Sequence, residues 1–243
     1  MSTWVAGVDG CPGGWVAVTL ALDGVADPLL TVHPTFAGVL GGPPAAAIVA
    51  VDMPIGLPDQ VGPGGRGPET LLRPLLGARQ SSVFSVPSRA AVETLDYRDA
   101  CAAALRTSVP PRAVSKQCFF LFPKIRDVDA LLRADPGLRD RVRETHPEGA
   151  FMRLNKGAPL SQPKKVKSSP YGPGLEERRA LLEKAGFARA FLEARPPRGA
   201  AFDDVLDACA CAVSALRIAR GEAQSFPSPP GRDAHDVPVA IWI

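Results

Sequence analysis

Apolar and polar positions alternate in short blocks at the start of the chain. Residues 3–8 form a mostly apolar run that ends at Asp9, a Gly-Cys-Pro-Gly-Gly turn follows, and residues 15–22 form a second run. Two such runs joined by a tight Gly-rich turn predict a β-hairpin. After a further Asp-Gly turn, residues 29–33 are predicted to form a third strand. The chain therefore begins with an antiparallel meander of three strands.

The pattern then changes to more continuous apolar segments. Residues 46–51 are apolar throughout, which is typical of a strand buried on both faces and paired in parallel inside a sheet. Residues 203–219 carry a broad apolar face and predict the strongest helix. Further helices are predicted after Thr35 and at 97–106, 127–134, 175–185 and 188–193, with extended segments at 139–145 and 237–243. This order indicates an α/β protein with a mixed central sheet flanked by helices.

Glycine and proline are unusually frequent, with 23 and 26 of the 243 residues. Disorder does not explain them, because 46% of the residues are hydrophobic and the net charge is only +3, whereas disordered chains combine low hydrophobicity with high net charge. The surplus is instead predicted to lie in loops at 58–77, which has room for one helical turn, at 155–174 and at 227–231. We expect a single domain over residues 1–243, with a helical and loop insertion at about 57–138.

Cysteine usage and the absence of long apolar runs limit the class of protein. The five cysteines form no Cys-x-x-Cys pair, which argues against a zinc site or a disulfide framework. No apolar run reaches the roughly 18 residues of a membrane span, and the N-terminal residues lack the basic and apolar regions of a secretory signal. We therefore expect a cytoplasmic protein without membrane association, and the sequence leaves its oligomeric state open.

Acidic residues stand at the ends of two predicted buried strands. Asp9 closes the first strand and Asp52 closes the strand at 46–51, at the sheet edge where α/β proteins build their sites. A buried carboxylate needs a cation or hydrogen-bond donors, because burying an unpaired charge is costly. Capping of a turn is the structural alternative for each of these two residues.

A second acidic group opens the predicted C-terminal helix. Asp204 and Asp207 are three residues apart and share a helix face, and Asp203 lies four residues before Asp207. Capping and compensation of the helix dipole explain Asp203 and part of the case for Asp204. They explain Asp207 poorly, because it borders the apolar face and like charges at this spacing repel unless a cation lies between them. We predict that this cluster binds metal.

A third group of candidates follows the extended segment at 139–145. In an extended backbone Glu144, His146 and Glu148 point the same way, because side chains alternate. A solvated strand edge is the alternative, and the sequence leaves open which of the three joins the site. Carboxylate oxygens are hard ligands, so the predicted cofactor is Mg²⁺ or Mn²⁺ rather than zinc.

Six motifs, in order along the chain, carry a resemblance to a known family. They are Gly7-Val8-Asp9-Gly10-Cys11-Pro12-Gly13-Gly14-Trp15, Val51-Asp52-Met53-Pro54-Ile55-Gly56-Leu57-Pro58, Ser81-Ser82-Val83-Phe84-Ser85-Val86-Pro87, Pro123-Lys124-Ile125-Arg126-Asp127-Val128-Asp129, Glu144-Thr145-His146-Pro147-Glu148 and Asp203-Asp204-Val205-Leu206-Asp207-Ala208. They resemble domain-of-unknown-function family 429, described as predicted RNase H-like nucleases. The meander that begins with an Asp, the parallel strand with a second acid and the C-terminal Asp-x-x-Asp helix resemble the RNase H-like fold, and the last element is similar to that of Holliday-junction resolvases.

The resemblance implies a metal-dependent nuclease on an RNase H-like fold. It implies that two metal ions about 4 Å apart are held by Asp9, Asp52, Asp204 and Asp207, with Glu144 as a further catalytic residue. The partner would be nucleic acid, either DNA or RNA, and basic residues would hold its backbone. The candidates for that role are Lys116, Lys124, Lys164, Lys165, Lys167, Arg178 and Arg179.

Two other functions fit parts of the pattern. A catalytically inactive RNase H-like protein that binds nucleic acid or another ligand would keep some of these acids without using them. A phosphotransferase related to actin and the sugar kinases would share the sheet topology and use the Gly-rich turn after Asp9 as a phosphate loop. The chain has no second Asp-x-Gly-Gly loop and no Gly-rich adenosine motif, which disfavours this reading.

Overall fold

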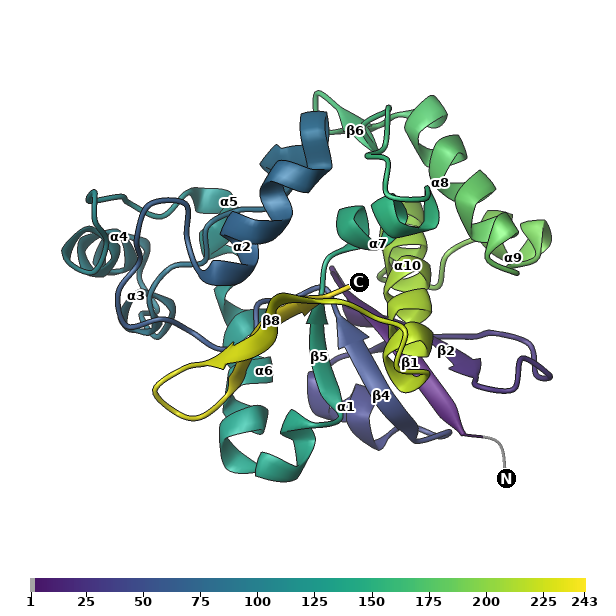
Figure 1. The fold of residues 1–243 in the computed structure, drawn as a ribbon, viewed down its shortest axis with the longest axis horizontal. Coiled ribbons are helices and arrows are strands. Elements are labelled where there is room, and N and C mark those ends of the chain that lie inside the picture. Colours follow the sequence, from purple (N-terminus) through teal and green to yellow (C-terminus); the bar gives the residue numbers. More distant parts are fainter. Residues whose placement is uncertain (1–2) are drawn as a thin grey trace.

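The computed structural model describes residues 3–243, which fold around a seven-stranded mixed sheet (Figure 1). The order of the strands across the sheet is β3-β2-β1-β4-β5-β9-β8. The strands are β1 (Trp4–Cys11), β2 (Gly14–Ala21), β3 (Leu29–His33), β4 (Ala46–Val51), β5 (Val142–Thr145), β8 (Ser225–Arg232) and β9 (Pro238–Trp242).

The first strands of the sheet follow the sequence prediction. β1 is antiparallel to β2, β2 is antiparallel to β3, and β4 lies parallel to β1 on its other side. β5 and β9 continue the parallel order. The three-stranded meander followed by parallel strands is therefore confirmed, and so is the mixed α/β class.

The edge strand β8 lies where the proline-rich run at 227–231 predicts a loop. β8 pairs antiparallel with β9 at its two ends, and its register shifts between Phe226 and Gly231. Prolines cannot donate a hydrogen bond to a neighbouring strand, so they are tolerated in a sheet only at an edge or a bulge. β8 occupies such an edge, which explains how a sequence that is poor for a central strand still completes the sheet.

The long helix α10 (Phe202–Ala219) lies across β1, β2 and β4 and covers one face of the sheet (Figure 1). Gly7 in β1 allows this close approach, because a Cβ at that position would lie 1.8 Å from the backbone nitrogen of Ala212. The apolar side chains of α10 pack on Val5, Val16 and their neighbours in the sheet. The same layer contains α7 (Pro147–Leu154), α8 (Gly172–Lys184) and α9 (Arg189–Glu193).

The opposite face of the sheet is covered by α1 (Phe36–Gly41) and α6 (Phe122–Ala134). The rings of Trp15 in β2 and Phe36 in α1 meet edge to face, with their centroids 5.0 Å apart. The indole of Trp15 also donates to Asp127 of α6 at 3.1 Å. The sheet is therefore enclosed between two apolar layers, so a functional site is expected at the ends of its strands rather than on its faces.

The expected insertion at 57–138 is mostly helical and packs beside the sheet (Figure 1). Two predictions are adjusted here: the region 58–77, predicted as a loop with one helical turn, contains α2 (Gly67–Leu72) and the start of η1 (Arg73–Ser82), and α6 starts at Phe122 rather than at 127. Helices α2 and α6 each carry a proline in their first turn, where the missing N–H costs nothing. In addition to α2, η1 and α6, the insertion contains α3 (Arg89–Val92), α4 (Tyr97–Arg106), α5 (Lys116–Phe119) and η2 (Pro136–Arg139).

The segment at 155–174, predicted as a flexible basic loop, contains a small hairpin. Its strands are β6 (Lys165–Val166) and β7 (Ser169–Pro170), which pair antiparallel. Lys167 and Ser168 form the turn with φ values of 49° and 66°. Two-residue turns of this kind require positive φ, and neither residue type signals such a turn as Gly or Asn would.

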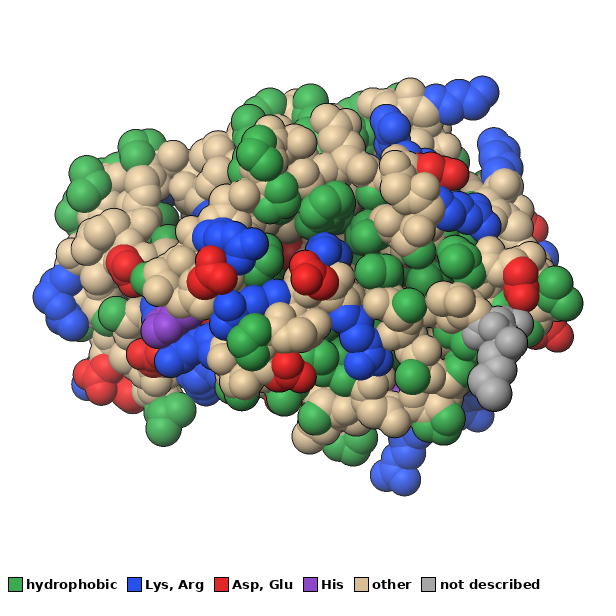
Figure 2. Space-filling model, turned by 60° about the horizontal axis from the view of Figure 1, so that its bottom comes forward, with side chains coloured by type: hydrophobic (Ala, Val, Ile, Leu, Met, Phe, Trp, Pro, Cys, Tyr) green, Lys and Arg blue, Asp and Glu red, His purple; other side chains and the backbone are tan. Residues whose placement is uncertain are grey.

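The charged surface and the cysteines of the structure can be compared with the composition of the sequence. Charged side chains of both signs are mixed on the face shown in Figure 2. No helix within residues 3–243 is long and apolar enough to cross a membrane. All five cysteines are free thiols, in agreement with the predicted absence of a disulfide framework.

Candidate acidic site at the sheet edge

Two neighbouring strands bring Asp9 and Asp52 to the same edge of the sheet. β1 and β4 run in parallel, and the backbone nitrogen of Asp52 donates to the carbonyl of Val8 at 2.9 Å. Because side chains alternate along a strand, both carboxylates project to the side covered by α10. Asp9 is 8% exposed, and its Oδ1 accepts a hydrogen bond from the nitrogen of Gly10 at 2.7 Å.

Helix α10 brings its own acidic residues to this edge. Asp203 and Asp207 are buried, with 4% and 1% of their surface exposed. Asp204 instead caps the helix, because its Oδ2 accepts from the backbone nitrogen of Ala201 at 2.9 Å. Asp203 and Asp204 both lie in the first turn, as compensation of the helix dipole predicts, but the cap is Asp204 rather than Asp203, which faces inward.

Two lysines at the start of the β6–β7 hairpin neutralise these acids. Lys164 Nζ contacts Asp207 Oδ2 and lies 3.8 Å from Asp203 Oδ2, and Lys165 Nζ lies 2.6 Å from the same Asp203 oxygen. The Lys164 side chain keeps 33% of its surface exposed. Sequence reasoning placed Lys164 and Lys165 on a substrate, whereas the structure places them on carboxylates. We call Asp9, Asp52, Asp203 and Asp207, with Lys164, the acidic cluster.

The ionised forms of Asp9 and Asp52 are destabilised by burial and by neighbouring carboxylates. Burial, followed by the charges of Asp52 and Asp207, raises the pKa of Asp9 well above its usual range. Burial and the charge of Asp207 raise the pKa of Asp52 to about 7. Lys164 lowers both pKa values. Burial lowers the pKa of Lys164 itself, but Asp207 and Asp9 outweigh that effect and hold it above normal. The cluster is therefore short of positive charge even with its lysine in place.

Glu144 does not join the acidic cluster. It pairs in register with Val51, whose side chain lies on the face away from α10. Its Oε1 accepts from Arg66 Nη2 at 2.6 Å, and its Oε2 accepts from the backbone nitrogen of Ile55 at 2.8 Å. Burial raises the pKa of Glu144 to about 7, although Arg66 acts in the opposite direction. Arg66 also pairs with Glu69, so Glu144 belongs to a buried ion-pair network.

The shared extended face predicted for Glu144, His146 and Glu148 is wrong, because helix α7 begins directly after His146. Glu148 contacts Arg178, which is fully buried and therefore lies inside the protein rather than on a substrate-binding surface. Nδ1 of His146 is buried and has no hydrogen-bond partner in the described part of the chain, and its Nε2 lies 3.4 Å from the carbonyl oxygen of Ser82. Burial lowers the pKa of His146, which keeps the ring neutral near pH 7.

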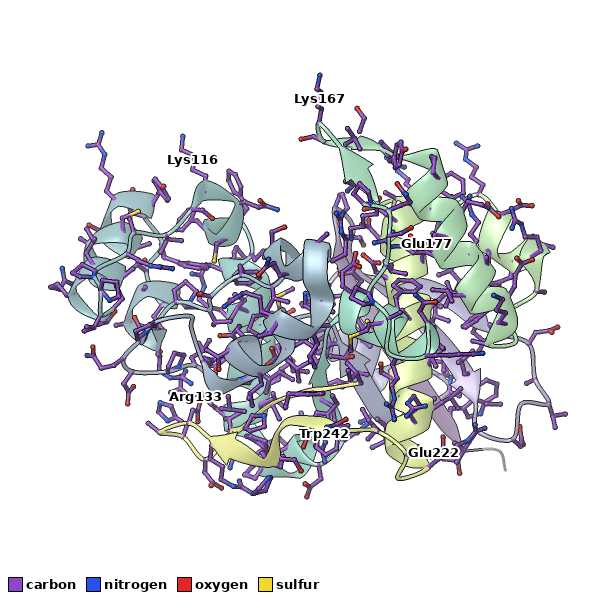
Figure 3. The ribbon with its side chains drawn as sticks, turned by 45° about the horizontal axis from the view of Figure 1, so that its top comes forward. Lys116, Arg133, Lys167, Glu177, Glu222 and Trp242 are labelled. Carbon is purple, nitrogen blue, oxygen red and sulfur yellow. The ribbon has the colours of Figure 1, made fainter. Side chains whose placement is uncertain are left out.

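The remaining basic candidates lie at different distances from the acidic cluster. Lys124 Nζ stands 5.5 Å from the centroid of the Trp15 ring, and its side chain passes Gly10, next to Asp9. Lys116 lies on α5 in the insertion and Lys167 lies at the tip of the β6–β7 hairpin, and both project from the same side of the molecule (Figure 3). Arg179 lies on α8 and lines a groove together with Asp203.

The acidic cluster fits a hard divalent cation in the chemistry of its donors. All of its acidic groups offer carboxylate oxygens, which Mg²⁺ and Mn²⁺ prefer. The carboxylate of Asp52 has no hydrogen bond or ion pair with any residue of the described chain. Within residues 3–243, however, no three His, Cys, Asp or Glu side chains are grouped closely enough to hold a metal ion. In this conformation the positive charge is supplied by Lys164 and Lys165, and metal binding stays a prediction.

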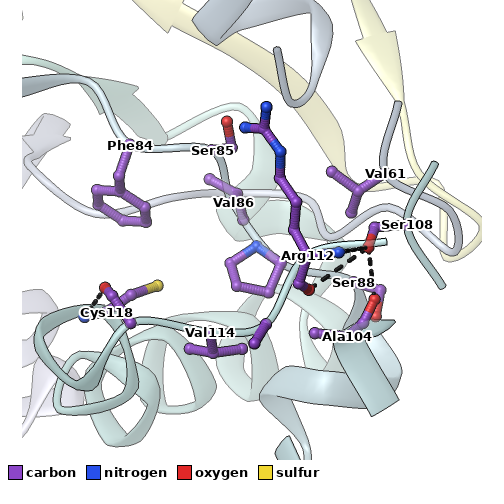
Figure 4. A pocket seen from close by; sticks show the side chains of 13 residues that line it. Val61, Phe84, Ser85, Val86, Ser88, Ala104, Ser108, Arg112, Val114 and Cys118 are labelled. Atoms are coloured by element: carbon purple, nitrogen blue, oxygen red, sulfur yellow. Dashed lines mark hydrogen bonds between the residues drawn. The ribbon is translucent and has the colours of Figure 1, made fainter. Parts of the chain in front are cut away.

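The insertion holds a separate cavity of about 230 Å³ (Figure 4). Its wall is mostly apolar and includes Val61, Val86 and Val114, with Arg112 beside them. The hydroxyl of Ser108 accepts from the backbone nitrogen of Arg112 at 2.8 Å. None of the residues that line it belongs to the acidic cluster, so the two sites are distinct.

The fold and the site define a class of protein: an α/β protein with a mixed seven-stranded sheet and buried carboxylates at the ends of two adjacent parallel strands. The chain belongs to DUF429, a protein family of unknown function, whose sequence model matches residues 7–232. The family predicted from the six motifs is therefore confirmed. No curated protein and no solved structure gives a match to the chain.

Proposed function

We propose that the protein is a metal-dependent nuclease that hydrolyses phosphodiester bonds at the acidic cluster. The observation that carries this proposal is that Asp9 and Asp52, at the ends of adjacent strands, converge with Asp207 of helix α10. Burial and the charge of Asp207 raise the pKa values of both Asp9 and Asp52, so the arrangement costs stability. Strongly perturbed ionisable groups of this kind are concentrated at functional sites.

The order of the elements supports an RNase H-like fold. An antiparallel meander is followed by a parallel strand, each of β1 and β4 ends in an acid, and an Asp-x-x-Asp helix crosses the sheet above them. These are the features on which the sequence resembles that fold. Membership in DUF429 does not supply an activity, so the case for nuclease chemistry rests on the site.

Mg²⁺ or Mn²⁺ would be held by Asp9, Asp52 and Asp207. Such ions generate a hydroxide nucleophile from bound water and stabilise the leaving oxygen of a phosphodiester. Asp204 suits this role less well than Asp207, because one of its oxygens already caps α10. Glu144 has both oxygens occupied by Arg66 and the Ile55 nitrogen, which assigns it to support of the sheet.

Lys164 has two roles in this proposal. Without a divalent cation its ammonium neutralises Asp207. When a cation takes over that charge, the partly exposed lysine is free to turn toward a phosphate at the edge of the cluster. Lys124, beside the turn that follows Asp9, contributes positive charge from the other side of the sheet edge.

A cleavage panel tests the proposal directly. The purified protein is incubated with Mn²⁺, Mg²⁺ or a chelator on double-stranded, single-stranded, hybrid and branched substrates. We expect cleavage of at least one substrate with metal and none with chelator, and we expect Asp9→Asn and Asp207→Asn each to reduce the rate at least about 100-fold, because both remove a charged ligand.

Glu144→Gln is the matched control, because it removes a buried carboxylate outside the acidic cluster. It is expected to reduce stability and to leave the metal dependence of cleavage unchanged. Cleavage that survives Asp9→Asn in protein free of contaminating nucleases would reject the assignment. Binding of nucleic acid without cleavage under any metal would instead support the inactive, ligand-binding alternative.

A further inference from the structure

A groove lined by three arginines lies beside the acidic cluster. It encloses about 420 Å³ between α8 and the segment that leads into α10. Arg179, Arg195 and Arg198 line it together with Phe202 and Asp203. Asp203 also belongs to the acidic cluster, so the groove and the cluster share a wall. The volume lies within the range of about 300–1,000 Å³ that is usual for small-molecule sites.

The arginines of the groove have guanidinium N–H groups that are available to a ligand. Arg195 and Arg198 are exposed, and neither has a hydrogen bond or ion pair with any residue of the described chain. The Arg179 side chain is 17% exposed, and among residues 3–243 its one ion-pair partner is Glu176, at 3.5 Å. Its Nε is buried, with no hydrogen-bond partner among the residues that the structure describes. Guanidinium groups match phosphate oxygens in geometry as well as charge, so this wall is suited to a phosphate group.

The loop that carries two of these arginines is held in place against the turn that follows Asp9. Arg195 and Arg198 are separated by two prolines, which fix the backbone angle φ. The nitrogen of Gly13 donates to the carbonyl of Gly199 at 2.8 Å, and Gly199 has a φ of 96°. A Cβ on Gly13 would approach the Cα of Gly199 to 3.0 Å. This contact fixes the position of the arginines relative to the strand that carries Asp9.

An aromatic side chain completes the groove. Phe202, the first residue of α10, is 42% exposed although it is large and apolar. Aromatic rings on which bases stack, placed beside positive charge, are the features by which proteins bind single-stranded nucleic acid. Phe202 and the arginines line the same groove, next to a residue of the acidic cluster.

We propose that this groove binds one nucleotide unit of a single strand, with its phosphate on Arg195, Arg198 and Arg179 and its base on Phe202. The inference rests on the proposed nuclease function and deepens it, because it names a single-stranded segment as the substrate that reaches the acidic cluster. The strand would leave the groove past Asp203 toward Asp9.

Binding is measured in a chelator, so that no cleavage occurs, by fluorescence anisotropy of labelled 12-nucleotide single strands of DNA and RNA. We expect the double variant Arg195→Ala/Arg198→Ala to bind at least about tenfold more weakly than the unmodified protein. Its slope of log affinity against log salt is expected to fall by about 0.7, since the groove holds one phosphate and each lost phosphate contact on a single strand contributes about 0.7. Phe202→Ala is expected to lose about fivefold or more through lost stacking.

The matched control is Arg98→Ala/Arg106→Ala on α4, which removes two exposed arginines from a helix of the insertion. It is expected to change the affinity less than twofold. If both double variants weaken strand binding equally, or if no strand binds at low salt, the groove is not the binding site. A nucleoside monophosphate that binds as tightly as the strand would overturn the assignment to a strand.

The same proteins in the cleavage panel separate this inference from the proposed function. Binding that depends on the groove arginines, without metal-dependent cleavage, would support the groove as a binding site and reject the proposed nuclease function. Asp9-dependent cleavage at an unchanged rate and KM in Arg195→Ala/Arg198→Ala would reject the groove and leave the nuclease standing.

Discussion

At the scale of single residues, the most informative side chain is Lys164. A lysine in contact with a buried aspartate is a counterion supplied by the chain itself. Two further carboxylates, Asp9 and Asp52, feel its charge. Removal of one partner of a buried ion pair is costlier than removal of both, because the remaining charge is left without compensation.

Lys164→Gln is therefore expected to lower the free energy of unfolding by about 1–3 kcal/mol at pH 7. This is less than the roughly 3–5 kcal/mol of a fully buried pair, because the lysine is one-third exposed. Urea denaturation followed by circular dichroism measures the change. Lys167→Gln, at the exposed tip of the same hairpin, is the control and should be neutral. Equal stability of the two variants would show that Lys164 does not compensate the cluster.

Millimolar Mn²⁺ is expected to restore part of the stability lost in Lys164→Gln. A cation that binds only the folded state stabilises it by mass action, and the variant has a vacated positive position for it. The shift in the urea midpoint with and without Mn²⁺ gives the size of the effect. The reference is the unmodified protein, in which Lys164 competes and the shift should be smaller. A shift of equal size in both proteins would contradict competition between the two cations.

The sequence identifies some residues of the site and misses others for physical reasons. Asp9 and Asp52 are recognisable because each ends a short apolar run, and Asp207 because it borders the apolar face of a helix. The inward direction of Asp203 is not predictable, since either Asp203 or Asp204 could cap α10 from the local pattern. The pairing of Lys164 depends on where a loop places a long side chain, and no periodicity encodes that.

At the scale of elements, the contact between β1 and α10 controls the site. Gly7 lets the helix backbone lie directly on the strand, and the same helix carries Asp207 toward Asp9. Any side chain at position 7 must separate the two elements, because a Cβ would lie 2.3 Å from the carbonyl oxygen of Ala208 as well as 1.8 Å from the nitrogen of Ala212.

Gly7→Ala is expected to lower the free energy of unfolding by about 3 kcal/mol or more, at the upper end of the cost of overpacking, since the obstacle is backbone rather than a flexible side chain. Mn²⁺ affinity, followed by calorimetry, should fall as well. Gly41→Ala, at a helical position with open space around it, is the control and should have little effect. A stable Gly7→Ala protein with unchanged metal affinity would contradict this role for the contact.

Elements with a clear period were predicted well, and elements set by context were not. The four N-terminal strands and α10 have apolar patterns long enough to identify. β8 contains prolines that local reasoning assigns to a loop, and only its place at the edge of the sheet makes it a strand. The short helices α3 and α5 depend on caps at Ser88 and Ser115, which are too brief to carry an amphipathic pattern.

At the scale of the whole molecule, the acidic cluster makes stability depend on pH. Asp52 has a pKa of about 7 when folded and about 3.8 as its ordinary value, so the folded protein holds the extra proton between these pH values. Stability contributed by this group is therefore present at low pH and is lost as pH rises toward and through 7. Asp9, whose pKa is also raised, acts in the same direction.

Asp52→Asn removes the Asp52 part of this dependence. In chelator, the unfolding free energy of the unmodified protein is expected to fall from pH 5 to pH 8 by about 2 kcal/mol more than that of the variant. Urea denaturation at both pH values measures the difference. Parallel changes of stability with pH in the two proteins would contradict a raised pKa for Asp52.

The Arg66–Glu144 ion pair limits how far this protein can be shortened. Glu144 sits in the middle of the sheet, yet its counterion comes from the insertion, at the start of α2. A shortened chain without residues 57–138 would retain a buried carboxylate in β5 with no guanidinium to meet it. The insertion therefore cannot be deleted independently of the sheet. Its outer loops can be varied, but removal of the segment that carries Arg66 would also require replacement of Glu144.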